Sequence, residues 1–340
     1  MQRHSNKSTK TRLAWGGIAQ AGQPFGYGII GHELHKALVG AGAEMLPLHD
    51  NSWDLAIGVG LPAMWAIGKQ ERPDMIWHTM LEVTPIIPNW EIPINNTAGL
   101  WVPSVWVKEL FEEGGVRKPI MVSGYGVDTD TFSFVDRSNR TGPFKVVTWG
   151  RSFSSRKNLF QAIRAFVAAE LPDAIMEVKV NSDDILAPTG VKDHPEIRII
   201  RENWPRQELV NWLQGADAFI YLSAGEGYGL MPLEAMATGL PTICAYNTGM
   251  KDFLEPSYAY LVESEGLEIA RTYTRSFGYD CYWHKVSLDS AVEQLRQVYY
   301  NNTEAINKGK IASEVVQKMT WGKAGENALK LIQSTFLGGK

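Results

Sequence analysis

The sequence has few of the features that tie a protein to an oxidising compartment or to a membrane. Its 340 residues include only two cysteines, Cys244 and Cys281, which are too few for a disulfide framework or a cysteine-rich zinc site. No apolar run reaches the ~18 residues that a membrane-spanning helix needs, and the polar residues 1–11 lack the apolar core of a signal peptide. We therefore expect a cytoplasmic protein without an integral membrane segment.

A large excess of charge of one sign is also absent. The formal net charge is −4, so the composition gives no general reason to expect binding to nucleic acid or to an acidic membrane surface. The sequence also has no pair of acidic residues in a loop where the pair could bind a metal ion. Asp183 and Asp184 flank a strand candidate, and Asp128 and Asp130 lie in an expected hinge. We expect no metal site.

Strand-like and helix-like patterns alternate along the chain, which is long enough for two domains of about 150 residues each. The first series of strand candidates covers residues 12–15, 44–48, 54–59, 75–78, 99–102 and 120–122, and the second covers 144–149, 174–180, 197–200, 218–222 and 241–245. The pattern predicts an α/β protein with two doubly wound domains, at residues 1–130 and 141–318, facing a cleft. Ligands then bind at the carboxyl ends of the strands.

The most informative stretch is 225–241, in which seven residues separate Glu226 from Glu234. Its glycines suit a tight turn after an apolar strand, and residues 230–238 have the pattern of a short helix. Uncovered amides at a helix N-terminus attract an anion such as a diphosphate. At about 1.5 Å per residue, the two carboxylates would lie roughly 12 Å apart, which suits the two ends of a nucleotide sugar.

This stretch resembles the signature of retaining glycosyltransferases with the GT-B fold, most closely glycosyltransferase family 4 (glycosyl transferases group 1). The resemblance implies a GT-B protein with a first, acceptor-side Rossmann-like domain and a second, donor-binding one. It also implies that a C-terminal helix, at about 320–340, packs back on the first domain. In the family the first glutamate faces the donor sugar and the second hydrogen-bonds the ribose, which are the roles of Glu226 and Glu234 here. The other donor-binding residues implied in this stretch are Gly227, Tyr228, Gly229 and Leu230.

Two cations follow the first strand of the second domain. Arg151 and Lys157 have the same spacing from Gly150 as the pair that neutralises the leaving diphosphate in the family. Arginine offers a planar fork and lysine a compact charge for this purpose. Arg156 adds an extra charge, and Asn158 stands where many relatives have glycine. The resemblance therefore implies catalytic roles for Arg151 and Lys157.

The part of the donor site that holds the base is less clear from the sequence. Relatives bind the base near the end of the strand that corresponds to residues 197–202, which places Arg201 in the donor pocket. No residue in this strand separates uracil from guanine or adenine.

In the first domain, residues 26–31 match the pattern G-x-G-x-x-G, and Asp50 follows. This is the dinucleotide fingerprint of a dehydrogenase, but that fingerprint needs its first glycine in the turn that leaves the strand. Here the loop 16–25 intervenes. The resemblance instead implies a glycine-rich loop that leads into a helix at 32–39 and brings Gly26, Tyr27 and Gly28 to the donor phosphates and the acceptor.

The strand candidate 75–78 ends in a histidine, His78, and a glutamate, Glu82, lies four residues further along the chain. The resemblance places a histidine here beside the donor sugar, so His78 is a candidate to bind a sugar hydroxyl or to support charge at the anomeric carbon. The alternative is a histidine whose hydrogen bonds are satisfied inside the domain. Glu82 also matches a family position, but its role is less defined.

These features favour a retaining glycosyltransferase that moves a hexose-type sugar from a UDP- or GDP-sugar to an acceptor hydroxyl, without a metal or a resident cofactor. The nucleotide sugar is then a substrate and partner. The acceptor stays open among glycans, lipid-linked glycans, small molecules, proteins and modified nucleic-acid bases. The alternatives are a nucleotide-sugar epimerase of the same architecture, an NAD-dependent oxidoreductase, and a non-catalytic sugar-nucleotide-binding protein.

Overall fold

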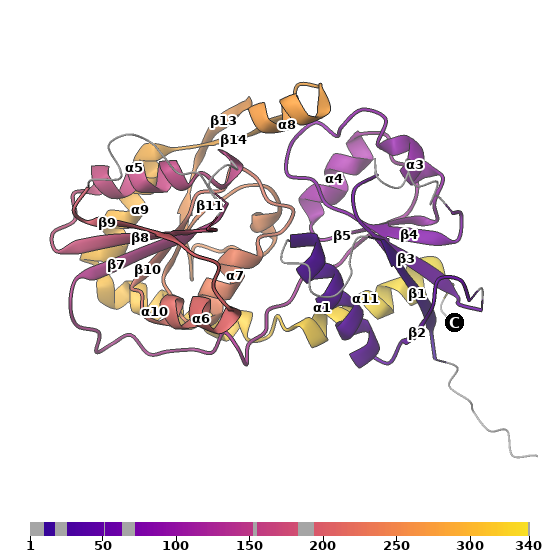
Figure 1. Ribbon diagram of the computed structural model, residues 1–340, viewed down its shortest axis with the longest axis horizontal. Coiled ribbons are helices and arrows are strands. Elements are labelled where there is room, and N and C mark those ends of the chain that lie inside the picture. Colours follow the sequence, from indigo (N-terminus) through magenta and orange to yellow (C-terminus); the bar gives the residue numbers. More distant parts are fainter. Residues whose placement is uncertain are drawn as a thin grey trace, which may run out of the picture. The chain divides into compact units, whose positions relative to one another are not determined.

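The computed structural model describes residues 10–17, 26–50, 52–62, 72–151, 155–182 and 194–338. The chain forms two compact units (Figure 1). The first comprises Met1–Met80, Pro88–Gly126 and Trp321–Lys340, and the second comprises Leu81–Ile87 and Val127–Thr320. The short segment Leu81–Ile87 interrupts the first unit in sequence but is part of the second.

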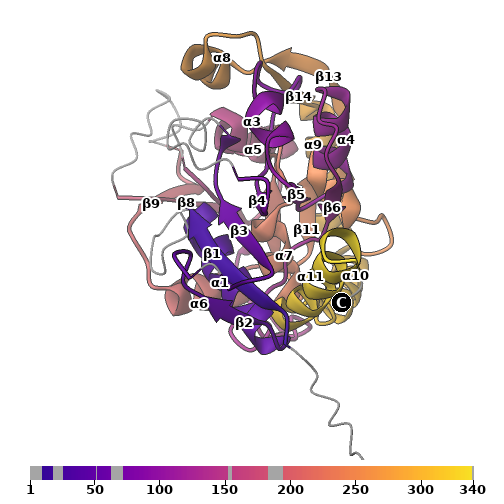
Figure 2. The same cartoon turned by 90° about the vertical axis from the view of Figure 1, so that its right-hand side faces the viewer.

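The first unit contains a six-stranded parallel sheet in the order β2-β1-β3-β4-β5-β6. Its central strands are fully buried, as expected for a parallel sheet with helices on both faces. Figure 2 shows α11 beside α1, against which it packs. The strands are β1 (Arg12–Gly17), β2 (Glu44–Leu46), β3 (Leu55–Val59), β4 (Met75–His78), β5 (Gly99–Val102) and β6 (Ile120–Val122), and the helices are α1 (Gly26–Gly40), α3 (Glu91–Asn95), α4 (Val105–Glu113) and α11 (Trp321–Phe336).

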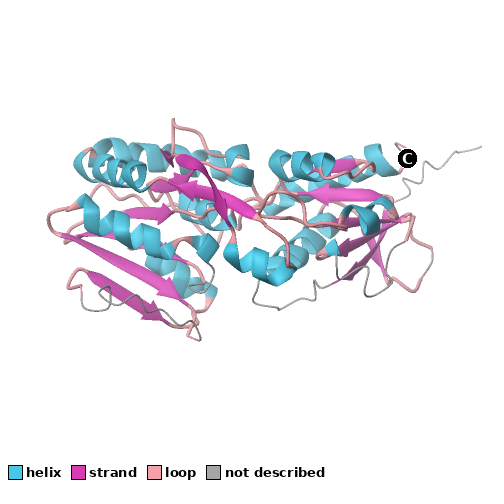
Figure 3. Cartoon of the chain, turned by 90° about the horizontal axis from the view of Figure 1, so that it is seen from above, coloured by secondary structure: helices cyan, strands magenta, loops and turns pink. Residues whose placement is uncertain are grey.

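The second unit contains a six-stranded parallel sheet in the order β12-β11-β10-β7-β8-β9. Helices α5 and α9 pack together on one face and α7 and α10 on the other (Figure 1), and Figure 3 shows the strands with helices beside them. The strands are β7 (Phe144–Trp149), β8 (Ala174–Val180), β9 (Ile197–Arg201), β10 (Ala218–Tyr221), β11 (Thr242–Ala245) and β12 (Tyr260–Val262), and the helices are α5 (Leu159–Ala169), α6 (Arg206–Gln214), α7 (Leu230–Ala237), α9 (Leu288–Tyr300) and α10 (Asn302–Val316), with the 3₁₀ turns η1 (Ser155–Lys157) and η2 (Thr248–Asp252).

An antiparallel hairpin is added to this second unit. It consists of β13 (Ser264–Ile269) and β14 (Tyr282–Val286), with α8 (Arg271–Phe277) between them. The sequence did not predict this insertion or β12.

The predicted fold class is confirmed, and a strand is present at each predicted position, with ends that differ by at most two residues. One expectation was wrong. The glycine-rich stretch 26–31 is not a loop, because α1 begins at Gly26. Ile30, Leu34 and Leu38 recur at every fourth position and are buried, so burial of one helix face outweighs the low helix propensity of glycine. Residues 18–25 of the expected loop lie outside the described residues.

The strand order of the second unit contains one reversal. The chain runs outward through β7, β8 and β9 and then returns to place β10 on the other side of β7. In such sheets ligands bind beyond the carboxyl ends of the strands at this switch point. The loops that follow Trp149 and Tyr221 are therefore where a ligand site is expected.

Arg137 joins the segment before β7 to two helix ends. It is 4% exposed, and its guanidinium donates to the carbonyls of Ala216, Leu213 and Thr238 at 3.0, 3.2 and 2.6 Å. These carbonyls lie at or just beyond the carboxyl ends of α6 and α7, where the helix dipoles favour a cation. Burial lowers the pKa of Arg137 to about 10, so it stays charged at neutral pH.

We expect Arg137→Ala to lower the free energy of unfolding by roughly 3 kcal/mol, because three buried carbonyls lose a charged donor. Urea denaturation measures this loss. Arg164→Ala, at an exposed position on α5, is the matched control and should change stability by less than about 0.5 kcal/mol. Equal effects of the two substitutions would contradict this role of Arg137.

Candidate active site

The loops after β7 and β10 bring together a carboxylate and two cations. Lys157 and Arg156 lie in η1, which follows β7, and Glu226 lies in the loop after β10. The two loops meet because β7 and β10 are paired neighbours, although about 70 residues of chain separate the side chains. The site therefore lies at the switch point of the sheet.

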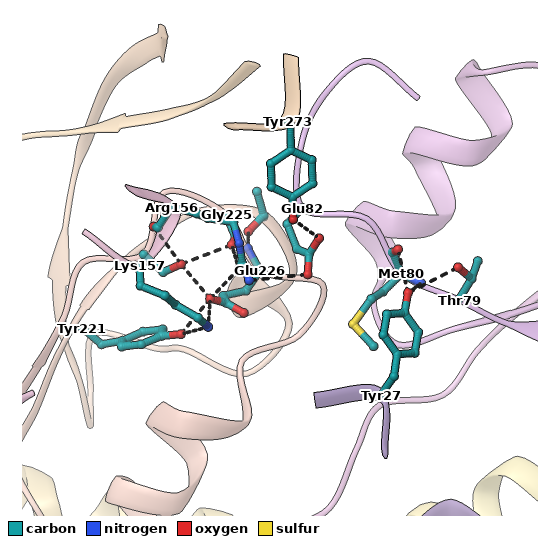
Figure 4. Close-up of polar contacts among 12 residues, drawn as sticks. Tyr27, Thr79, Met80, Glu82, Arg156, Lys157, Tyr221, Gly225, Glu226 and Tyr273 are labelled. Atoms are coloured by element: carbon teal, nitrogen blue, oxygen red, sulfur yellow. Dashed lines mark hydrogen bonds and ion pairs between the residues drawn. The ribbon is translucent and has the colours of Figure 1, made fainter. Parts of the chain in front are cut away.

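Glu226 is held through one oxygen by four donors (Figure 4). Its Oε1 accepts from Lys157 Nζ at 2.6 Å, Ser223 Oγ at 2.6 Å and Tyr221 Oη at 2.7 Å. The Arg156 guanidinium lies 2.7 Å from the same oxygen. Within the part of the chain that the structure describes, all hydrogen bonds and ion pairs of this carboxylate fall on Oε1.

The two cations keep this buried carboxylate charged. Its side chain is only 10% exposed, and burial alone would raise its pKa. The charges of Arg156 and Lys157 outweigh burial and hold the pKa of Glu226 well below its usual range. Glu226 is therefore an ionised hydrogen-bond acceptor at neutral pH and a weak base.

Arg156 contacts a second carboxylate. Its guanidinium lies 3.6 Å from Glu82 Oε1, and it also donates to the Gly225 carbonyl. Tyr273 Oη donates to the other oxygen of Glu82 at 2.8 Å. Figure 4 shows these side chains in one group with Glu226. The sequence analysis noted Arg156 only as an extra charge and did not identify Tyr221, Ser223 or Tyr273.

The second glutamate of the motif lies on α7. Glu234 is buried, and Arg206 at the start of α6 donates to its Oε1 at 2.9 Å. Burial raises the pKa of Glu234, and the charge of Arg206 opposes that rise. Helix α7 begins after Gly229, which has a left-handed conformation with φ of 114° and no capping side chain. A Cβ at Gly229 would also lie 2.8 Å from Met250 Cγ, so glycine is required there.

The remaining donor-side candidates differ in exposure. Gly227 and Tyr228 are buried, Leu230 is half-buried at the first turn of α7, and Arg151 and Arg201 are exposed at the carboxyl ends of β7 and β9. All of them lie in the loops or strand ends on the carboxyl side of the sheet. Their roles stay predictions.

The candidates in the first unit lie near the start of α1 and the end of β4. Gly26 is exposed and Gly28 is buried, both within the helix. Tyr27 Oη donates to the Met80 carbonyl at 3.1 Å and accepts from the Met80 amide at 3.2 Å. This pair of hydrogen bonds joins the first turn of α1 to the segment after β4.

His78 is fully buried within this unit. Its Nε2 lies 2.8 Å from Tyr125 Oη, and its ring packs edge-on against Trp101 with the centroids 4.9 Å apart. Burial lowers the pKa of His78 to about 3, so the imidazole is neutral at physiological pH. Its Nδ1 is buried and has no hydrogen-bond partner among the described residues, so the alternative of a fully satisfied histidine is not met. The role of His78 toward a donor sugar stays a prediction.

Protonation of His78 should make folding pH-dependent. Between its unfolded pKa of 6.5 and its folded pKa of about 3, only the unfolded state binds the proton, so stability falls as pH falls from 6.5. The loss by pH 4 is about 3 kcal/mol. Urea denaturation of wild type and His78→Gln at pH 7 and pH 4 measures it. A stability difference between them that does not change with pH would contradict this burial effect.

No group of three or more His, Cys, Asp and Glu side chains in the described part of the chain is placed to hold a metal ion. Asp183 and Asp184 lie outside the described residues. No described helix is both long and apolar enough to cross a membrane.

Comparison with solved structures identifies the architecture. Sucrose-phosphate synthase from Thermosynechococcus elongatus superposes with a TM-score of 0.72 at 15% identity, covering 97% of this chain and 100% of that one. The chain has the GT-B fold. HepE from Anabaena, solved with UDP and glucose, matches this GT-B protein with a TM-score of 0.68 at 12% identity over 95% of this chain and 100% of that one. WaaG, a glycosyltransferase involved in lipopolysaccharide biosynthesis, superposes with a TM-score of 0.65 at 11% identity, covering 94% of this chain and 99% of that one.

The sequence of the GT-B protein also matches a family model. Residues 191–270 match the family described as Glycosyl transferases group 1, and this range contains both Glu226 and Glu234. No curated protein matches the chain in sequence. The family match and the fold confirm the predicted likeness and indicate a glycosyltransferase.

Proposed function

We propose that this GT-B protein is a retaining glycosyltransferase that moves a hexose-type sugar from a UDP- or GDP-sugar to an acceptor hydroxyl. One observation carries the proposal. At the switch point of the second sheet, a buried carboxylate is held through Oε1 by two cations and two hydroxyls. Its Oε2 has no hydrogen-bond donor among the described residues and is placed to accept from a ligand. Sugar hydroxyls are donors that suit such an oxygen.

The leaving diphosphate needs positive charge beside the sugar. Lys157 and Arg156 supply two cations at Glu226. The uncapped N-terminus of α7, which begins four residues after Glu226 at Leu230, adds backbone amides. Arg151, exposed at the end of β7, adds a third cation from the same loop. Preorganised charges of this kind stabilise a departing anion in the transition state.

Glu234 is placed to bind the ribose of the nucleotide sugar. Arg206 donates a hydrogen bond to its Oε1. Burial of Glu234 favours the neutral carboxyl group, whereas the charge of Arg206 favours the ionised form. An ionised carboxylate accepts two hydrogen bonds from a vicinal diol such as the ribose hydroxyls. HepE, which has this fold, was solved with UDP and glucose, and this supports a nucleotide sugar as the donor.

Retention is proposed from the resemblance of residues 225–241 to the signature of retaining GT-B glycosyltransferases, and the low basicity of Glu226 agrees with it. A carboxylate whose pKa lies well below its usual range does not take the acceptor proton at neutral pH. We therefore assign that proton to the leaving phosphate oxygen, with attack on the same face of the sugar. Glu226 then orients the donor sugar and places a negative charge near the anomeric carbon.

We expect Glu226→Gln to reduce release of UDP or GDP from the sugar donor by about 100-fold, because the charge near the anomeric carbon is lost. Free UDP or GDP should still bind within about threefold of wild type. Calorimetry with UDP, GDP, ADP and NAD and a nucleotide-release assay with their sugar conjugates measure both effects. Glu314→Gln, exposed on α10, is the control and should match wild type.

The same experiment separates the alternatives. Binding of NAD in preference to every nucleoside diphosphate would favour the oxidoreductase. Binding of a nucleotide sugar without release of its nucleotide to any acceptor would favour a non-catalytic binding protein. Normal turnover in Glu226→Gln would overturn the site assignment.

We also propose that transfer needs no metal, since Arg151 and the backbone amides at the start of α7 lie beside the cations Arg156 and Lys157 and together take the place of a divalent cation at the leaving diphosphate. Excess EDTA should then leave the initial rate within about twofold of the untreated enzyme. The assay is nucleotide release before and after chelation. A complete loss that magnesium or manganese restores would contradict this part of the proposal.

A further inference from the structure

Arg156 links Glu226 to a second pair of side chains, because it also contacts Glu82, which accepts a hydrogen bond from Tyr273. We propose that Glu82, itself held by Tyr273, is a positioning residue that holds the Arg156 guanidinium away from Glu226 Oε2 and so leaves this oxygen for the donor sugar. This inference rests on the proposed function of Glu226. It assigns a task to Glu82 and to the inserted hairpin with α8.

The backbone around Glu82 is attached firmly to the second unit. Thr84 and Tyr282 of β14 exchange two backbone hydrogen bonds, at 2.8 and 2.7 Å. The Glu82 carbonyl also lies so close to Gly225 that a Cβ at Gly225 would collide with it. Glu82 is thus fixed beside the residue that precedes Glu226.

The side chain of Glu82 is fixed from the other side by the insertion. Tyr273 Oη donates to Glu82 Oε2 at 2.8 Å, and its ring packs edge-on against Trp283 of β14 at a centroid distance of 6.3 Å. No residue of α8 is fully buried, so this short helix adds little to a hydrophobic core. Its contact with Glu82 is the feature that links it to the site (Figure 4).

The two ends of the Arg156 fork have different partners. Nη1 contacts Glu226 Oε1 at 2.7 Å and the Gly225 carbonyl, whereas Nη2 lies toward Glu82 Oε1 at 3.6 Å. Arginine prefers to bind one carboxylate through both nitrogens. Without the charge of Glu82, Nη2 is free to turn to Glu226. Because three other donors already fill Oε1, it would take Oε2, the oxygen proposed for the sugar.

Charge balance points the same way. Arg156 and Lys157 carry two positive charges, and Glu226 and Glu82 carry two negative ones, so the buried group is neutral as a whole. Removal of one carboxylate leaves the other to pair with both cations. The positive charge that is then in excess does not weaken binding of a diphosphate, so weaker binding that is confined to the sugar nucleotide reports the loss of Glu226 Oε2 as an acceptor.

The test compares Glu82→Gln and Tyr273→Phe with wild type in calorimetric titrations with UDP, UDP-glucose, GDP and GDP-mannose. Glu82→Gln keeps the shape of the side chain and removes only its charge. We expect it to weaken binding of the sugar nucleotide at least tenfold and to leave the free nucleoside diphosphate within threefold. Tyr273→Phe should act in the same direction by about threefold, the loss of one hydrogen bond. Glu265→Gln, which breaks an exposed ion pair with Lys285 on the same hairpin, is the control and should have no effect.

The double variant separates positioning from a purely structural role. If Tyr273 acts only by holding Glu82, the double variant should bind the sugar nucleotide no more weakly than Glu82→Gln alone. Equal weakening of UDP and UDP-glucose, or no weakening of either in both variants, would overturn the inference. A wild-type protein that binds no sugar nucleotide would overturn the proposed function instead, so the two failures are distinguishable.

Discussion

The second unit depends on the compensation of one buried negative charge. Glu226 is 10% exposed, and Arg156 and Lys157, also largely buried, are its nearest cations. A buried carboxylate without these partners would bind a proton, and the two cations without it would be strongly destabilised. The carboxylate and the cations therefore require each other, and the loops that carry them have to take up this one arrangement.

The sheet makes this arrangement possible. Because the strand order reverses between β7 and β10, the loops after these two strands leave the sheet side by side, with no strand between them. Tyr221, at the end of β10, and Ser223, just beyond it, then lie within hydrogen-bonding distance of Glu226. The buried strands thus provide a rigid base from which short loops present polar groups, as in other doubly wound sheets.

Regular parts of the fold were predictable from sequence because buried parallel strands are near-continuous apolar runs, as in β3, β4 and β10. The hairpin of β13 and β14 was not, since most of β13 is exposed and its sequence carries no such run. The start of α1 was predicted wrongly, because local sequence signals and burial in the folded chain favour different structures at residues 26–31. Its glycines favour a loop locally, whereas the decisive contribution comes from burial of Ile30, Leu34 and Leu38.

The sequence by itself determined the α/β class, the strand positions, and the motif that contains Glu226 and Glu234. Local patterns carry this information, because periodicity, glycine positions and helix signals depend on residues close together in the chain. Only the tertiary structure decided which charges meet. Glu82, Arg156 and Tyr273 are distant from one another in sequence, and burial and strand order bring them to Glu226. Pairing between such distant groups depends on chain topology, which no local pattern records.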